Sequence, residues 1–197
     1  PGAPWQRVWD RPWSRSRPQS QPGPASHQPD TDWLFERHVC GQQQLLLQLQ
    51  FGSLAAAVTE HPDVVGRYLG QLADFSTRAF VALNTAFAQD GAYVYVPDKV
   101  VLEQPLQIMF VSTGTSATPT MSHPRTLIVT GDDSQVQIVE TYVSAPGEKH
   151  FTNAVTEVVA GENAIVDHYK VEEESLDAFH IASMHIHSSR SSNVSSH

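Results

Sequence analysis

The chain of 197 residues is poor in cysteine, in aromatic residues and in long apolar runs. Its single cysteine, Cys40, can form neither an internal disulfide nor, by itself, a cysteine-based zinc or cluster site, which favours a reducing compartment. The longest apolar runs, such as 54–58 and 108–111, are far shorter than the roughly 20 residues that span a bilayer. A net charge of −9 disfavours nucleic acid, whose backbone is anionic. We therefore expect neither membrane nor nucleic-acid binding.

Residues 1–30 differ in composition from the rest of the chain. They are rich in proline and arginine, and tryptophan recurs every four residues at Trp5, Trp9 and Trp13. Such a segment buries too little apolar surface to offset chain entropy, which predicts a disordered tail. Arginine- and serine-rich, acid-poor N-termini are also typical of organellar transit peptides. We expect a cytoplasmic (bacterial) protein, or a plastid protein if the tail is a transit peptide.

Residues 31–91 are predicted to form a helical N-terminal region. A short helix is expected over 31–38. Ser53 precedes a second apolar stretch as its cap, and Pro62 suits the first turn of another helix, where its missing N–H is not needed. A further helix is expected over 76–88. One apolar face of that helix is predicted from its large side chains: Phe80, Leu83 and Phe87.

After Asp90 and Gly91 the hydrophobic period changes from 3.6 to 2, and Val, Ile, Thr and Tyr dominate. Turn residues separate the apolar stretches. The pattern predicts strands over 92–96, 99–102, 106–112, 125–130, 135–143, 150–160, 164–173 and 178–187.

An internal repeat indicates how these strands are arranged. Residues 128–136 (IVTGDDSQV) match residues 158–166 (VVAGENAIV), with a glycine and an acid at the same place in each. A period between 20 and 50 residues, without a helix in the unit, is typical of a β-solenoid. The glycine suits a corner that needs positive φ or close approach of two backbones. An antiparallel sandwich with two similar hairpins would give the same pattern, so both arrangements stay open.

Histidines gather near the end of the chain, at positions 180, 185, 187 and 197. His185 and His187 lie on one face of a predicted strand, a spacing that metals use. No third ligand stands in fixed register and no cysteine is near, so a solvated strand face is the favoured interpretation.

An acidic run includes Glu172, Glu173, Glu174 and Asp177. Paired carboxylates can perform acid–base chemistry, but neighbours on a strand point to opposite faces, which favours a solvated turn. Cys40 has no placed base and is interpreted as an inert thiol. The sequence contains neither a phosphate loop nor a nucleophile elbow. We therefore assign no catalytic, cofactor-binding or metal-binding residue, and expect a protein that is not an enzyme.

Several motifs together resemble the SufB/SufD family of SUF iron–sulfur cluster assembly, and its SufD-type members in particular. The resemblance covers roughly residues 50–197. The motifs, in order, are 52–54 (GSL), 79–83 (AFVAL), 82–97 (ALNTAFAQDGAYVYVP), 123–129 (HPRTLIV), 151–157 (FTNAVTE), 166–170 (VDHYK) and 190–197 (RSSNVSSH). The SufD type is favoured by residues 153–157 and by the lack of cysteine in the β region.

The resemblance implies an α+β fold, with a small helical region over 31–91 followed by the first coils of a right-handed parallel β-helix over 92–197. It implies a scaffold subunit that works with a SufB-like partner and a SufC-like ATPase, through parts largely outside this chain. A cluster would be assembled transiently by the full complex and not held by this chain. The family's functional positions lie outside these residues, so we expect a longer native chain.

Two other functions remain open on the residues alone. A polysaccharide-active parallel β-helix enzyme would need aligned carboxylates and basic residues, and lysine and arginine are scarce after residue 100. A small metal-binding β protein would use His185 and His187.

Overall fold

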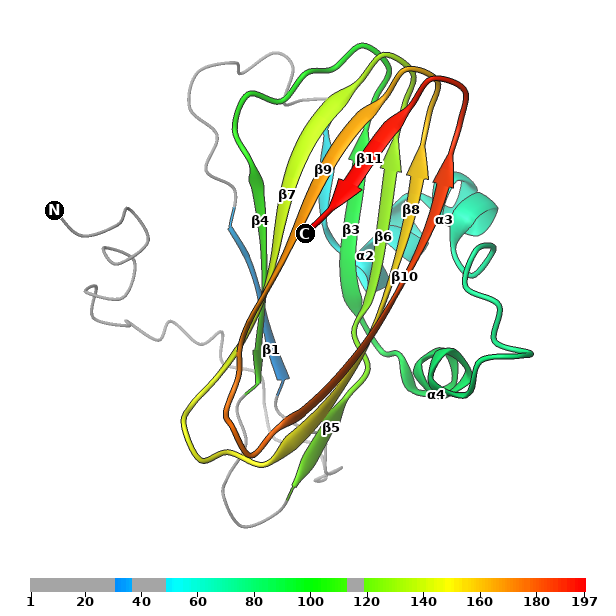
Figure 1. The fold of residues 1–197 in the computed structure, drawn as a ribbon. Coiled ribbons are helices and arrows are strands. Elements are labelled where there is room, and N and C mark those ends of the chain that lie inside the picture. Colours follow the sequence, from blue (N-terminus) through cyan, green and yellow to red (C-terminus); the bar gives the residue numbers. More distant parts are fainter. Residues whose placement is uncertain (1–30, 37–48, 113–118) are drawn as a thin grey trace, which may run out of the picture.

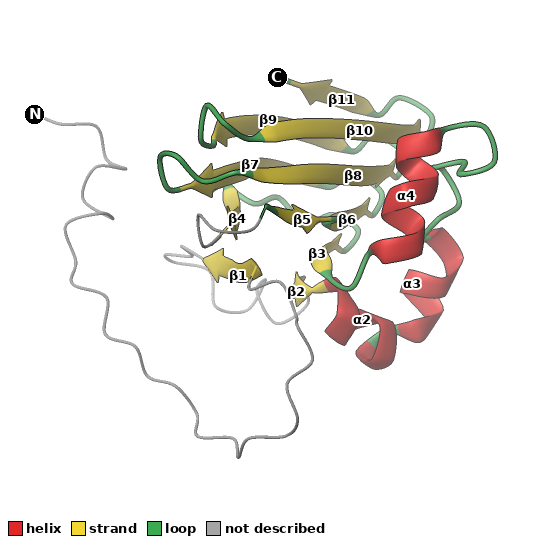
Figure 2. Cartoon of the chain, turned by 90° about the horizontal axis from the view of Figure 1, so that it is seen from below, coloured by secondary structure: helices red, strands yellow, loops and turns green. Residues whose placement is uncertain are grey.

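The computed structural model describes residues 31–36, 49–112 and 119–197, and in 31–36 it describes the backbone. The described strands form two sheets whose members alternate along the chain (Figure 1). One sheet has the order β1-β4-β7-β9-β11 and the other β10-β8-β6-β3-β2, with β5 paired to β8. Successive turns of chain stack as layers, and the helices lie against one side of the stack (Figure 2). The predicted α+β fold with a parallel β-solenoid is confirmed.

The elements follow in the order that the change of period predicts. The first part contains β1 (Thr31–Glu36), β2 (Gln50–Ser53), α2 (Leu54–Glu60), α3 (Pro62–Tyr68) and α4 (Ala79–Phe87). The solenoid strands are β3 (Gly91–Val96), β4 (Leu106–Ser112), β5 (Thr120–Ser122), β6 (Arg125–Thr130), β7 (Gln135–Ser144), β8 (His150–Ala160), β9 (Ile165–Glu173), β10 (Phe179–Ser188) and β11 (Asn193–Ser196). No described helix has the length and apolar character needed to cross a membrane.

The strand register shows that the sequence repeat is one coil of the solenoid. Ile128 of β6 pairs with Val158 of β8, and Gln135 of β7 pairs with Ile165 of β9, both in parallel. Each partner lies 30 residues further along the chain (128 to 158, 135 to 165). The parallel pairing rules out the antiparallel sandwich for this part of the chain, and the two copies of the repeat lie directly on top of each other.

Gly131 and Gly161, the glycines of the repeat, are required because the backbones of neighbouring coils lie close together there. Neither glycine has a positive φ. A Cβ built on Gly161 would lie 2.6 Å from the carbonyl carbon of Gly131 and 2.8 Å from the amide nitrogen of Asp132. The left-handed backbone falls two residues later, at Asp133 and Asn163, with φ of 55° and 56°. Aspartate and asparagine tolerate this conformation better than most residues. The corners therefore stack because glycine leaves room and the following residue makes the turn.

The core lies between the two sheets and is built from alternate residues of each strand. Small and branched side chains dominate it, as the composition predicts. Its fully buried members include Val94, Ile108, Ile128, Ile138, Val158 and Val166.

Helix α2 begins where the sequence predicts. The Ser53 hydroxyl accepts a hydrogen bond from the amide of Ala56 at 3.1 Å and donates to the Asp90 carboxylate at 2.9 Å. Asp90 also accepts from the amides of Ala55 and Gly91. This network fixes the start of the helix against the start of β3.

Three predictions about residues 31–91 are wrong. Residues 31–36 form strand β1, not a helix; the chain pairs antiparallel with the free side of β4, and this tertiary contact overrides a weak local signal. Strand β2 is a further strand in the region predicted as helical. In α4 the buried residues are Val81 and Asn84, while Phe80 and Phe87 are 45% and 60% exposed.

Some smaller predictions also need correction. The predicted strand over 99–102 is wrong: the chain turns at residues 98–99, where Lys99 takes a positive φ, and Val101 then forms an isolated bridge to Gln135. Strands β5 and β11 were not predicted because they are short. The predicted disordered tail over 1–30 and Cys40 lie outside the described residues.

Candidate functional site

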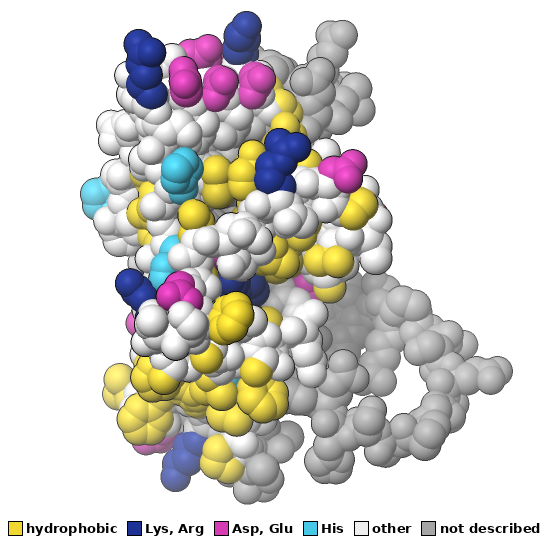
Figure 3. Space-filling view, turned by 90° about the vertical axis from the view of Figure 1, so that its right-hand side faces the viewer, with side chains coloured by type: hydrophobic (Ala, Val, Ile, Leu, Met, Phe, Trp, Pro, Cys, Tyr) yellow, Lys and Arg dark blue, Asp and Glu magenta, His cyan; other side chains and the backbone are white. Residues whose placement is uncertain are grey.

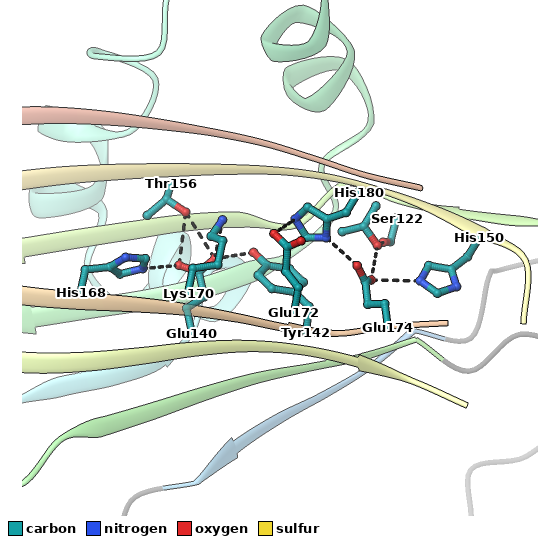
Figure 4. Close-up of polar contacts among 11 residues, drawn as sticks. Ser122, Glu140, Tyr142, His150, Thr156, His168, Lys170, Glu172, Glu174 and His180 are labelled. Atoms are coloured by element: carbon teal, nitrogen blue, oxygen red, sulfur yellow. Dashed lines mark hydrogen bonds and ion pairs between the residues drawn. The ribbon is translucent and has the colours of Figure 1, made fainter. Parts of the chain in front are cut away.

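A chain of polar side chains runs through the interior of the solenoid, between the two sheets (Figure 4). We call this set the lumen network. Its members are Ser122, Glu140, Tyr142, His150, Thr152, Thr156, His168, Lys170, Glu172, Glu174, His180 and Ser196. It stands out because it brings charged side chains into a core that is built mainly from apolar residues.

The first half of the lumen network is centred on Glu140, whose side chain is fully buried. His168 Nε2 donates to Glu140 Oε2 at 2.8 Å, and Lys170 Nζ lies 3.6 Å from Oε1. The hydroxyl of Tyr142 donates to the same oxygen, and that of Thr156 lies 3.3 Å from Oε2. A buried carboxylate is costly unless it is paired and hydrogen-bonded, and Glu140 has both kinds of partner.

The second half is centred on Glu174, which follows β9. His150 Nε2 lies 2.9 Å from Oε1, and His180 Nδ1 lies 2.7 Å from Oε2. The Thr152 hydroxyl donates to Oε1 at 2.9 Å. Since a carboxylate only accepts, both histidines place a ring N–H toward Glu174. The ring of His180 also contacts Tyr142 edge-on, with centroids 4.6 Å apart, which joins the two halves.

These contacts determine the ionisation of the buried groups. Burial alone would raise the pKa of Glu140, but the hydrogen bond from His168 and the charge of Lys170 lower it to about 2. Burial and the Glu140 charge raise the pKa of Tyr142 well above its usual value. For Glu174, burial opposes ionisation, yet hydrogen bonds from His180, His150 and Thr152 hold its pKa below the usual range. Both carboxylates are therefore ionised at neutral pH.

The lumen network can hold charge and fix the two sheets against each other. It places the imidazoles of His150, His168 and His180 beside the carboxylates of Glu140 and Glu174. Among the described residues no three His, Cys, Asp or Glu side chains are grouped as a metal site requires. The contacts of Glu140 and Glu174 make the lumen network a buried network of hydrogen bonds and charges.

A second polar cluster holds the helices against the outside of the solenoid. Arg125 donates to Glu157 Oε2 through Nη2 at 2.6 Å and through Nε at 3.1 Å. Glu157 also accepts from the backbone amides of Gly70, Leu72 and Ala73. Burial would raise the pKa of Glu157, but the Arg125 charge and these amides lower it.

Asn84 of α4 completes this cluster. Its amide donates to the carbonyls of Pro124 and Asn153 at 2.9 and 2.8 Å, and its oxygen accepts from Arg125. Figure 3 shows this helix-bearing face, where hydrophobic side chains also remain at the surface. The cluster has a structural role, because its polar groups are committed to one another.

The structure divides the histidines that the sequence grouped together. His180 points into the lumen and is buried, while His187 on the same strand is exposed. His185 lies beside Glu157 of β8 in the strand register; burial and the nearby Arg78 lower its pKa despite the Glu157 charge. His197 stacks on Tyr169 at the surface. His185 and His187 thus belong to the outer face of β10.

The predicted solvated turn over the acidic run is wrong at one position. Glu174 is buried in the lumen, with 7% of its side chain exposed, while Glu173 and Asp177 are exposed. Adjacent residues here do point to opposite sides, and Glu174 is on the inner side.

Sequence reasoning missed Glu140, Tyr142 and His168, although a signal was present. Glu140 stands in the same alternating phase as the core residues Val136 and Ile138, and His168 follows Val166 in the same way. A charged residue in the apolar phase of a strand predicts a buried, paired group.

The fold and the two polar clusters define a class: a parallel β-solenoid with a small helical region docked on one sheet. The chain matches the family model described as "SufBD protein N-terminal region" over residues 31–108. It matches "SUF system FeS cluster assembly, SufBD core domain" over residues 110–197. The chain belongs to the SufBD family of iron–sulfur cluster assembly proteins.

Curated relatives agree with this assignment. The chain is 37% identical over 126 residues to the iron–sulfur cluster assembly SufBD family protein slr0076 of Synechocystis, a match covering 60% of this chain and 27% of that protein. It is 33% identical over 124 residues to the iron–sulfur cluster assembly protein SufD of Bacillus subtilis, covering 62% and 28%. The chloroplastic SufBD family protein ABCI8 of Arabidopsis thaliana is 28% identical over 123 residues, covering 62% and 22%. The match thus spans about a quarter of each relative.

Proposed function

We propose that this chain is part of a SufD-type scaffold subunit of a SUF complex, which works with a SufB-like subunit and a SufC-like ATPase. The observation that carries the proposal is the match of both SufBD domains, in order, to one solenoid with docked helices. The likeness to SufD of Bacillus subtilis supports the SufD type. In this proposal the cluster is assembled transiently by the whole complex and is not held by this chain.

The architecture suits a scaffold. Each coil pairs with the next over most of its length, and the lumen network joins the two sheets from inside. A stack held by such parallel pairing presents rigid faces and edges to partners. A glycan-active enzyme, the alternative function, would need free basic residues on neighbouring coils, whereas Arg125 and Lys170 are both committed to buried carboxylates.

The same relationship supports a proposal for the compartment. The relatives include a chloroplastic protein and bacterial proteins. We place the protein in the bacterial cytoplasm, or in a plastid if residues 1–30 act as a transit peptide. Fusing residues 1–30 to a fluorescent protein and testing import into isolated chloroplasts distinguishes the two.

The test is co-purification with SufB-like and SufC-like proteins from the same organism. The 197-residue chain and the chain extended to the length of its relatives are each tagged and co-expressed with both proteins. We expect the extended chain to retain both partners and the 197-residue chain not to retain the SufC-like ATPase. Tight binding of that ATPase by the 197 residues alone would contradict this arrangement, and failure of the extended chain to bind either partner would overturn the function.

A further inference from the structure

His180 connects the two sheets across the lumen and uses only one of its ring nitrogens in a hydrogen bond. Nδ1 donates to Glu174 at 2.7 Å. Nε2 is buried and has no hydrogen-bond partner, yet it lies 3.5 Å from Oε1 of Glu172. The His180 side chain is 8% exposed and that of Glu172 is 47% exposed. A buried ring nitrogen is thus aimed at a carboxylate that can reach solvent (Figure 4).

The protonation state of His180 decides what this contact contributes. Since Glu174 accepts from Nδ1, the neutral ring has a lone pair on Nε2, which faces the lone pairs of Glu172. A second proton turns Nε2 into a donor toward Glu172 and gives the ring a positive charge between two carboxylates. Charge-assisted hydrogen bonds of this kind are stronger than neutral ones.

Charged and polar groups surround His180 on several strands. His180 is faced by Glu172 and Glu174 at the end of β9, by the Tyr142 ring on β7 and, through Glu174, by His150 on β8. Beyond Tyr142 lie Glu140 on β7 and Lys170 on β9, whose Nζ is 5.1 Å from the Tyr142 ring centre. Lys170 and His168 both lie beside Glu140, so the two carboxylates that contact His180 itself are Glu172 and Glu174.

His150 provides a contrast in the same cluster. Its Nε2 bonds Glu174, as Nδ1 of His180 does, but its Nδ1 is buried with no hydrogen-bond partner. A second proton on His150 would bury an N–H group without an acceptor, which is costly. The geometry therefore separates the two histidines: a proton added to His180 meets a carboxylate.

We propose that His180 is a proton-operated clasp: a proton on Nε2 closes the ring onto Glu172 and ties β9 of one sheet to β10 of the other. The clasp therefore closes when lowering the pH adds a proton to Nε2, and it opens when raising the pH removes that proton. This device goes beyond the scaffold role and does not depend on it.

Opening the clasp need not unfold the coil. The turn after Glu174 is held separately, since the Ser175 amide donates to the Ser144 hydroxyl at 2.7 Å and the Gly147 amide donates to the Ser175 hydroxyl at 3.1 Å. The clasp thus changes how often the C-terminal end of β9 opens, while the rest of the solenoid keeps its strand pairing.

Hydrogen exchange of the 197-residue chain tests the proposal. Mass spectrometry follows peptides covering 170–182 between pH 8 and pH 5.8, corrected for the intrinsic exchange rate, with a chelator present so that a metal cannot replace the proton. We expect about tenfold slower exchange at the lower pH, as one charge-assisted hydrogen bond provides. The change should disappear in His180→Gln and Glu172→Gln and persist in His187→Gln, whose histidine is exposed on the same strand.

Each possible result of these measurements either supports the clasp or overturns it. A wild-type chain with no pH-dependent protection in this segment overturns the clasp, and so does full pH dependence in Glu172→Gln. If His180→Gln does not fold, Glu172→Gln still decides, because the Glu172 side chain is half exposed and its loss leaves no buried gap. Nitrogen-15 spectra of the rings give a second measurement: at pH 5.8 His180 should carry protons on both ring nitrogens, and a singly protonated His180 there contradicts the proposal.

Discussion

Nε2 of His168 lies 2.8 Å from Oε2 of Glu140, and both side chains are completely buried between the two sheets of the solenoid. The two residues belong to neighbouring coils, since Glu140 is on β7 and His168 on β9. Their contact therefore joins one coil to the next inside the core, away from bulk solvent.

Replacing Glu140 by glutamine should destabilise the protein by about 3 kcal/mol at pH 7. The change keeps the shape but leaves Lys170 and His168 without the carboxylate that satisfies them, and breaking a buried pair costs about 3–5 kcal/mol. Urea unfolding gives the free energy. Glu162→Gln is the matched control, because Glu162 is exposed at a corner and should change stability little. Equal effects of the two substitutions would contradict a buried ionised Glu140.

The Glu140 contribution should depend on pH in a defined direction. Its pKa falls from 4.5 in the unfolded chain to about 2 in the folded one. A lowered pKa gives stability that is present above pH 4.5 and is lost as pH falls toward 2. The difference in unfolding free energy between wild type and Glu140→Gln should therefore shrink between pH 5 and pH 2. A difference that stays constant over this range would show that the carboxylate is not the source.

Substitution by alanine should have opposite effects on stability at Gly161, in a corner of the solenoid, and at Gly66, in helix α3. Gly161→Ala places a Cβ 2.6 Å from the carbonyl carbon of Gly131 and 2.8 Å from the amide nitrogen of Asp132. These backbone atoms cannot move aside as a side chain can, so the substitution should cost about 2–3 kcal/mol. Gly66→Ala in α3 meets nothing within 4 Å and should stabilise by about 0.5–1 kcal/mol, because alanine is the better helix former. Thermal unfolding measures both. A neutral Gly161→Ala would show that the coils do not approach as closely as described.

The solenoid could be predicted because the sequence patterns that specify it are local and occur more than once. Alternation marks the strands, and the match of 128–136 with 158–166 gives the register that the sheets adopt. Strand β1 could not be predicted, since its pairing with β4 joins segments more than 70 residues apart (31 to 112). Six residues carry too little local preference to oppose such a contact.

The two polar clusters differ in how far the sequence reveals them. Glu140 and His168 carry a readable signal, because each occupies the apolar phase of its strand. Arg125 and Glu157 stand in the outward phase, where charged residues are ordinary. Their burial arises only because the loop at residues 70–73 docks over them, which no pattern within the strands records.

The Arg125–Glu157 pair should hold this loop to the solenoid. Arg125→Met keeps the length of the side chain but leaves Glu157 buried without its counter-charge, at a cost of about 3 kcal/mol. Urea unfolding should show this loss, and hydrogen exchange should show faster opening of the amides of Gly70, Leu72 and Ala73. Arg190→Met, at an exposed corner, is the matched control.

A second substitution separates the charge from the packing. Adding Glu157→Gln to Arg125→Met removes the uncompensated charge while keeping an oxygen that accepts from the loop amides. If the buried charge is the source of the loss, the double variant is more stable than Arg125→Met alone, by about 1 kcal/mol or more. If the double variant is less stable still, the carboxylate is stabilised chiefly by the three loop amides, and Arg125 acts through its contacts with Asn84 and Thr85.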